Sequence, residues 1–85
     1  MSTSTEIRFD GKVAIVTGAA QGMGREHSFL LGKRGAHVIV NDLDADGAEQ
    51  TAKVIRDGGG HAKAVPGSIA EREVAQSLVD TAIET

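Results

Sequence analysis

A glycine-rich segment is the first part of the sequence whose residue types and spacing could do chemistry. Residues 17–24 read TGAAQGMG, which is a G-x3-G-x-G spacing that follows a short apolar run and leads into a helical pattern. At such a junction, backbone N–H groups and the positive end of a helix can bind a pyrophosphate. Gly18 would allow a sharp turn, Gly22 would let phosphate approach the backbone, and Gly24 would allow close packing of the helix on the sheet.

An acidic residue complements this turn. Asp42 stands eighteen residues after Gly24 and follows the second apolar run, where a carboxylate can accept both hydroxyls of an adenosine ribose. Asp44 and Asp46 lack this register and are expected to be solvated charges near a helix N-terminus. The turn and Asp42 together predict a dinucleotide site. A carboxylate at position 42 would repel a ribose 2′-phosphate, so NAD is favoured over NADP.

Three short segments are expected to form the strands that position these residues. The runs at 12–16 and 36–41 are nearly continuously apolar, which is typical of strands buried on both faces. The run at 61–65 alternates with a period of two and predicts a third strand nearer the edge of the sheet.

Helical patterns lie between and after these strands. Residues 25–34 form the first predicted helix, residues 45–57 the second, and a capping-box pattern at 68–71 introduces the third. The side chains that repeat at helical spacing are Met23, His27, Leu30, Leu31 and Arg34 in the first helix, and Ala45, Ala48, Ala52 and Ile55 in the second. The predicted fold class is α/β, the N-terminal β-α-β-α-β-α half of a doubly wound Rossmann fold with a parallel sheet.

The chain of 85 residues is long enough for one small domain at most. Residues 1–8 are expected to be a flexible leader, and residues 9–85 to be the N-terminal half of a dinucleotide-binding domain. The last residues close a helix where such a domain would enter its fourth strand, so we expect a domain truncated at that point. The first strand would then lie at an open sheet edge, which predicts a homo-oligomer.

Composition excludes several other classes. Nine basic against twelve acidic residues give a net charge of −3 without a block of either sign, so a nucleic-acid partner is not expected. No stretch has the length and apolarity of a membrane span and no signal-peptide pattern occurs, so we expect no membrane association and a cytoplasmic location. There is no cysteine, and His27, His37 and His61 lack a metal-ligand spacing, so no metal site is predicted.

These features resemble the N-terminal half of the short-chain dehydrogenase/reductase family, whose T-G-x3-G-x-G motif is present without a mismatch at 17–24. The similarity covers residues 9–85 and includes the strand end Asn41-Asp42-Leu43 and the strand exit at 64–66. The resemblance implies an NAD-dependent oxidoreductase that transfers a hydride between a nicotinamide cofactor and an alcohol or ketone substrate. It also implies that Gln21 and Met23, within the turn, and Leu43, beside Asp42, belong to the cofactor site.

The resemblance further implies an adenine contact after the third strand. Family members usually carry an Asp followed by an aliphatic residue there, whereas this sequence has Ser68-Ile69. The serine oxygen can accept from the adenine amino group, and the Ile69 N–H can donate to the ring. Ser68 is equally suited to capping the next helix, and both interpretations stay open.

The same resemblance bears on cofactor choice and catalysis. NADP-selective members usually have a basic residue near the second glycine, where this chain has Gln21; Arg8 and Arg25 are the residues that would favour NADP instead. The catalytic Asn, Ser and Tyr-x3-Lys of the family have no counterpart here, so no catalytic residue is assigned and the chain alone is expected to be inactive. Two alternatives are a non-catalytic dinucleotide-binding module and half of an S-adenosylmethionine-binding methyltransferase, which typically has a tighter G-x-G turn.

Overall fold

The parallel sheet is the centre of the structure, a computed structural model that describes residues 9–84. Its elements are β1 (Val13–Thr17), α1 (Gly22–Lys33), β2 (His37–Asn41), α2 (Ala45–Asp57), β3 (His61–Ala64) and α3 (Arg72–Glu84). The three strands are parallel, in the order β1-β2-β3. The β-α-β-α-β-α prediction and the edge position of the third strand are therefore confirmed. The leader predicted at residues 1–8 lies outside the described residues.

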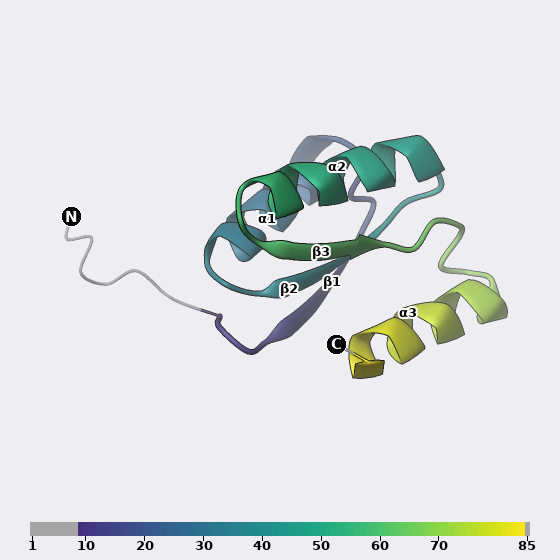
Figure 1. Ribbon diagram of the computed structural model, residues 1–85. Coiled ribbons are helices and arrows are strands. Elements are labelled where there is room, and N and C mark those ends of the chain that lie inside the picture. Colours follow the sequence, from purple (N-terminus) through teal and green to yellow (C-terminus); the bar gives the residue numbers. More distant parts are fainter. Residues whose placement is uncertain (1–8, 85) are drawn as a thin grey trace.

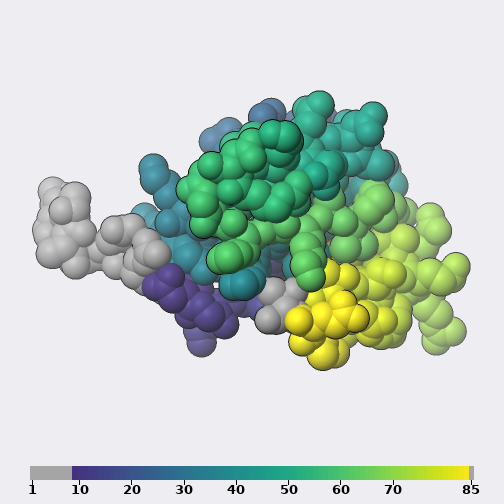
Figure 2. Space-filling model, viewed as in Figure 1, coloured from purple at the N-terminus to yellow at the C-terminus, as the bar shows by residue number. Residues whose placement is uncertain are grey.

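Helices cover both faces of this sheet. The helices α1 and α2 lie on one face and α3 lies on the other (Figure 1), and the space-filling view shows α2 and α3 on opposite sides of β3 (Figure 2). The main core lies between the sheet and the first two helices and includes Val38, Val40, Ala48, Ala52 and Ile55. On the other face, α3 contacts β1 and β2 and buries Leu78. No helix within residues 9–84 is long and apolar enough to cross a membrane.

Burial of β1 differs from the sequence-based prediction. Ala14 and Val16 pack against the core, but Val13 and Ile15 are 39% and 42% exposed. The prediction of a strand buried on both faces is therefore wrong for β1, whereas Val38, Ile39 and Val40 of β2 are all buried. The difference arises because β1 has a neighbouring strand on only one side in the described sheet.

The face that α1 turns to the core differs from the prediction in part: Leu31 packs against the core as expected, but other members of the predicted stripe do not. Met23 and Leu30 are 74% and 46% exposed, whereas Ser28 and Gly32 are buried. A Cβ atom at Gly32 would lie 2.7 Å from Cγ2 of Ile55, so α1 approaches α2 more closely than a larger side chain would allow. Small residues thus form the fully buried part of the α1 packing face, beside the partly buried Phe29 and Leu31, which also pack against the core.

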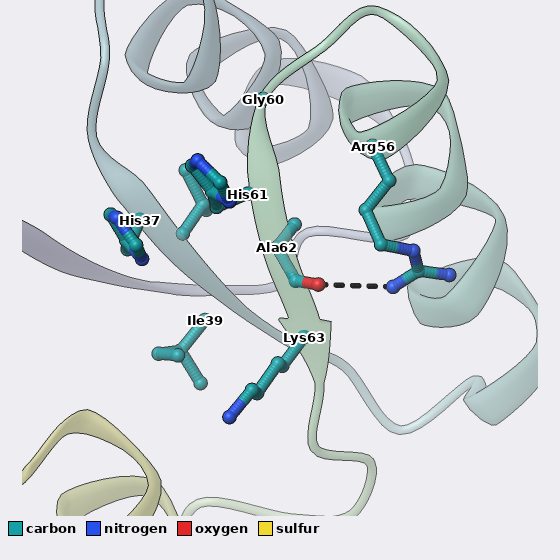
Figure 3. Close-up of a pocket in the computed structure, with 8 residues that line it drawn as sticks. His37, Ile39, Arg56, Gly60, His61, Ala62 and Lys63 are labelled. Atoms are coloured by element: carbon teal, nitrogen blue, oxygen red, sulfur yellow. Dashed lines mark hydrogen bonds between the residues drawn. The ribbon is translucent and has the colours of Figure 1, made fainter. Parts of the chain in front are cut away.

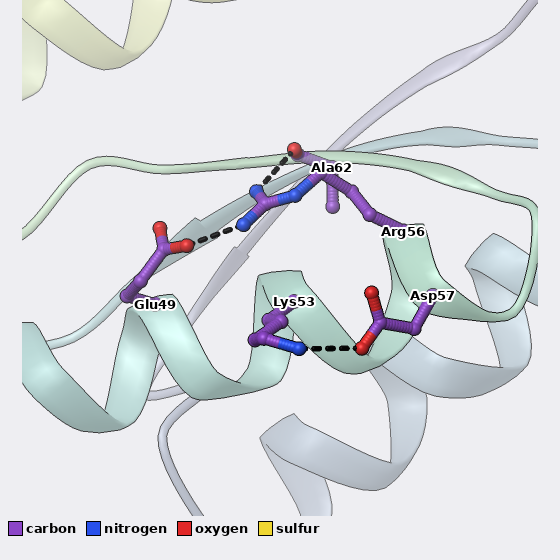
Figure 4. A network of polar contacts seen from close by, with 5 residues as sticks. All are labelled: Glu49, Lys53, Arg56, Asp57 and Ala62. Atoms are coloured by element: carbon purple, nitrogen blue, oxygen red, sulfur yellow. Dashed lines mark hydrogen bonds and ion pairs between the residues drawn. The ribbon is translucent and has the colours of Figure 1, made fainter.

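The charged side chain of Arg56, on α2, reaches the outer edge of β3 (Figure 4). Arg56 donates through Nη1 to the Ala62 carbonyl at 3.0 Å and pairs through Nη2 with Glu49. Since residue 65 bonds to β2, and alternate residues of a strand bond to opposite sides, the Ala62 carbonyl faces the open edge. Arg56 thus occupies a carbonyl that another strand would otherwise pair with.

Candidate functional site

The glycine turn connects β1 to α1 at the carboxyl end of the sheet. Gly18 and Gly22 have φ angles of +65° and +63°, in the left-handed region that favours glycine. A Cβ atom at Gly24 would lie 2.2 Å from the carbonyl oxygen of Gly18. The close approach at Gly24 is therefore to the backbone of the turn itself.

The N-terminus of α1 has the properties of an anion-binding end. Gln21 is the N-cap residue, with extended backbone, and its side chain makes no capping hydrogen bond. The first turn of α1 also contains no acidic residue. The first N–H groups of a helix have no intrahelical acceptor, and the helix dipole is positive there. An anionic group can therefore bind at this end without displacing a protein carboxylate.

Asp42 lies directly beside the turn. Its Oδ2 accepts from the Ala20 N–H at 3.0 Å, and its Oδ1 accepts from the Asp44 N–H at 2.9 Å. The hydrogen bond from the Asp44 backbone, followed by that from Ala20, lowers the pKa of the Asp42 carboxyl below its usual range. A half-buried, ionised carboxylate is thus fixed against the backbone of the glycine turn.

This lowered pKa predicts a contribution of Asp42 to acid stability. The carboxylate stabilises the folded state above the unfolded pKa of about 4, and this contribution is lost as the pH falls through the lower folded-state pKa. We expect Asp42→Asn to lose less stability than the wild type between about pH 5 and pH 2. Urea unfolding across this range measures the effect, with the exposed Asp46→Asn as the control. Parallel pH profiles for the wild type and Asp42→Asn would contradict it.

Three exposed apolar side chains lie in the segments that follow the strands at this end of the sheet. Met23 is the second residue of α1, Leu43 follows β2, and Ile69 follows the exit of β3; they are 74%, 75% and 51% exposed. The residues of the predicted cofactor site thus lie at or just beyond the carboxyl ends of the strands, where ligands bind to open α/β sheets.

Ser68 takes part in a local turn. Its Oγ accepts from the Ala70 N–H at 3.2 Å, and its carbonyl accepts from the Glu71 N–H at 3.0 Å. Because α3 begins at Arg72, Ser68 is not the N-cap residue, and the predicted capping box is wrong. The competing hydrogen bonds within residues 68–71 form a turn that delays the start of the helix.

Two buried polar residues support the site and were not identified from the sequence. Asn41, 3% exposed, donates through Nδ2 to the carbonyls of Val65 and Gly67 at 2.9 and 3.1 Å. Thr51, fully buried, donates through Oγ1 to the Ala19 carbonyl at 2.9 Å. The signal in the sequence that could have identified Asn41 and Thr51 was that each is a polar residue within an apolar pattern. Thr51 is buried in α2, whereas Ala45, which the sequence assigned to that stripe, is exposed.

A second hollow lies at the opposite, amino end of the strands and measures about 440 Å³. It is lined by His37 and His61, whose rings stack 4.4 Å apart across β2 and β3, and by Arg56 and Lys63 (Figure 3). Residues 9–84 contain no group of three or more His, Cys, Asp or Glu side chains that could hold a metal ion. This hollow is separate from the glycine turn.

Comparison with known proteins identifies the family. The profile of the short chain dehydrogenase family matches residues 12–85. The chain belongs to the short-chain dehydrogenase family. The members of this family that it matches are oxidoreductases built on the Rossmann fold, which confirms the family resemblance based on the glycine motif.

Two relatives in this family are each identical to this chain at about two fifths of the aligned residues. It is 41% identical to the peroxisomal multifunctional enzyme type 2 of Drosophila melanogaster, over 98% of this chain and 15% of that protein. It is 39% identical to the 7alpha-hydroxysteroid dehydrogenase of Escherichia coli K12, over 98% of this chain and 32% of the enzyme. The chain thus spans a third or less of these relatives.

A solved structure agrees with these sequence matches. A 7alpha-hydroxysteroid dehydrogenase complexed with NADH and 7-oxo glycochenodeoxycholic acid has a TM-score of 0.87 and 38% identity to this chain. The match covers 99% of this chain and 33% of that structure. Both the order of the elements and the parallel sheet are therefore those of the family.

Proposed function

We propose that this chain is the cofactor-binding portion of an oxidoreductase that transfers a hydride between NAD(H) and an alcohol or ketone. The observation that carries the proposal is the Asp42 carboxylate, held against the Ala20 N–H beside the N-terminus of α1. This arrangement places the carboxylate oxygens of Asp42, which can accept from ribose hydroxyls, next to the N–H groups at the start of α1, which can donate to a pyrophosphate. The NADH in the similar hydroxysteroid dehydrogenase supports a nicotinamide cofactor here.

The described residues fit the three parts of a dinucleotide. The pyrophosphate would lie at the turn formed by Gly18, Gln21, Gly22, Met23 and Gly24. Asp42 would accept from the ribose hydroxyls. Leu43, Ser68 and Ile69 would contact the adenine, and the exposure of Leu43 and Ile69 supports this assignment. When bound, the nicotinamide accepts or donates the hydride, and this chain holds the cofactor in place.

NAD is the proposed form of the cofactor. The ionised Asp42 would repel a 2′-phosphate, and in the described residues around it the two hydrogen bonds to its oxygens come from uncharged backbone groups. Arg25, the described arginine that would favour NADP, lies 5.2 Å above the Phe29 ring on the side of α1. Arg8, the other arginine considered, lies outside the described residues.

The catalytic proton transfer is proposed to require residues beyond this sequence. The 85 residues contain no tyrosine, so the general acid/base of the family has no counterpart, and we expect the chain alone to bind cofactor without turnover. Family membership favours this role over a methyltransferase half. We further propose a cytoplasmic location, a homo-oligomeric state, and no nucleic-acid or membrane partner.

The cofactor preference tests this function. We expect the wild-type chain to bind NAD at least about tenfold more tightly than NADP, because the Asp42 carboxylate accepts from the ribose and repels a phosphate. The variant Asp42→Ala should narrow or reverse this ratio. Isothermal titration with both dinucleotides measures it, and Asp46→Ala is the control with the same change of charge. An unchanged ratio in Asp42→Ala would refute the role of this residue.

A further inference from the structure

Thr51 is a buried polar residue in an otherwise apolar helix face. It is fully buried, as are Ala48 and Ala52 beside it in α2. Its Oγ1 donates to the carbonyl of Ala19, 32 positions earlier in the chain and within the glycine turn, at 2.9 Å. An aliphatic side chain of the same shape would fill the same space but would leave the Ala19 carbonyl without this donor.

The hydrogen bond from Thr51 completes a set that fixes the start of the turn. The Ala19 N–H donates to the carbonyl of Asn41, and the next N–H, of Ala20, donates to Asp42. Close packing adds to these bonds. Gly47 of α2 lies so near the turn that a Cβ atom added to it would be 2.7 Å from the Ala20 Cβ. The turn is thus held between the end of β2 and the first turns of α2.

We propose that Thr51 is a positioning residue that keeps the glycine turn in its ligand-binding conformation. The inference rests on the proposed function, since it assumes that the turn binds the pyrophosphate of a dinucleotide. Ala19 stands three residues before Gly22, where the segment with the N–H groups of Gly22, Met23 and Gly24 begins. Fixing its carbonyl orders those donors before the ligand arrives, which reduces the conformational entropy lost on binding.

Removal of the hydroxyl should therefore weaken the binding of ligands that contain a pyrophosphate. Thr51→Val keeps the side-chain shape but leaves the Ala19 carbonyl, in a fully buried residue, without this donor. We expect about tenfold weaker binding of ADP-ribose. Adenosine has no pyrophosphate, so its affinity should change by less than about twofold. Thr51→Ser retains the hydroxyl and should restore most of the ADP-ribose affinity.

The experiment is an NMR titration of the 85-residue chain with ADP-ribose and, separately, with adenosine. Ile55→Val is the matched control, because it removes a buried methyl group from the same helix face near Gly32 and away from the turn. It should lower stability without changing the ratio of the two affinities. Should Thr51→Val fail to fold, Thr51→Cys, which has a weak thiol donor, takes its place with the same expected direction.

The outcomes separate this inference from the function on which it rests. If the wild type binds neither ligand, the proposed function fails. If the wild type binds ADP-ribose and Thr51→Val binds it equally well, the positioning role is overturned. The positioning role is also overturned if Thr51→Val and Ile55→Val weaken both ligands in the same proportion, because Thr51 would then act only through stability. A selective loss of ADP-ribose affinity, with rescue by serine, supports the inference.

Discussion

Replacing Gly24 by alanine is expected to destabilise the folded chain strongly. The new Cβ atom would lie 2.2 Å from the Gly18 oxygen and 2.9 Å from its carbonyl carbon, and both are backbone atoms that cannot rotate away. The turn would have to separate from α1, and we expect a loss of at least about 3 kcal/mol. A domain of this size has a total stability of about 4–13 kcal/mol, so the loss is a large fraction of it.

Gly22→Ala is the matched control for this prediction. No atom lies within 4 Å of a Cβ at Gly22, so the expected cost is the strain of its positive φ, about 1–2 kcal/mol. Urea unfolding followed by circular dichroism compares the two variants, which differ by one methyl group at neighbouring positions of one turn. Equal stabilities would show that the close approach at Gly24 does not control folding.

The second large effect is expected at the open edge of β1. Val13 and Ile15 are exposed there, and a hollow of about 620 Å³ lies between β1 and α1, lined in part by Ile15 and Leu30. Unpaired strand edges with apolar side chains recruit other chains. The wild-type chain should therefore associate as its concentration rises, and Ile15→Lys should weaken this association by about tenfold or more.

Sedimentation velocity across a concentration series measures this association. Val54→Lys is the control, because Val54 is 48% exposed on α2 and its substitution changes the charge equally without touching β1. The β3 edge is not expected to associate in the same way, since Arg56 already occupies its Ala62 carbonyl. A wild type that stays monomeric at high concentration, or equal effects of the two lysine variants, would refute the β1 interface.

The sequence by itself determined the order of the elements and the location of the candidate site. Glycines at 18, 22 and 24 mark the junction between a strand pattern and a helix pattern, and the apolar residues on its two sides have distinct periods. These are local properties, because turn conformation and periodicity depend on residues close together in the chain. For the same reason the register of Asp42 after β2 could be read directly, and the structure places its carboxylate against Ala20.

Only the tertiary structure decided which faces are buried and which polar groups support the site. The apolar pattern of β1 matches that of β2, yet β1 is partly exposed because its environment depends on strands that pair with it. The role of Thr51 likewise depends on a carbonyl 32 positions away. Helical periodicity identifies the face on which a side chain lies, but burial and hydrogen bonding are set by segments distant in the sequence, which local patterns do not specify.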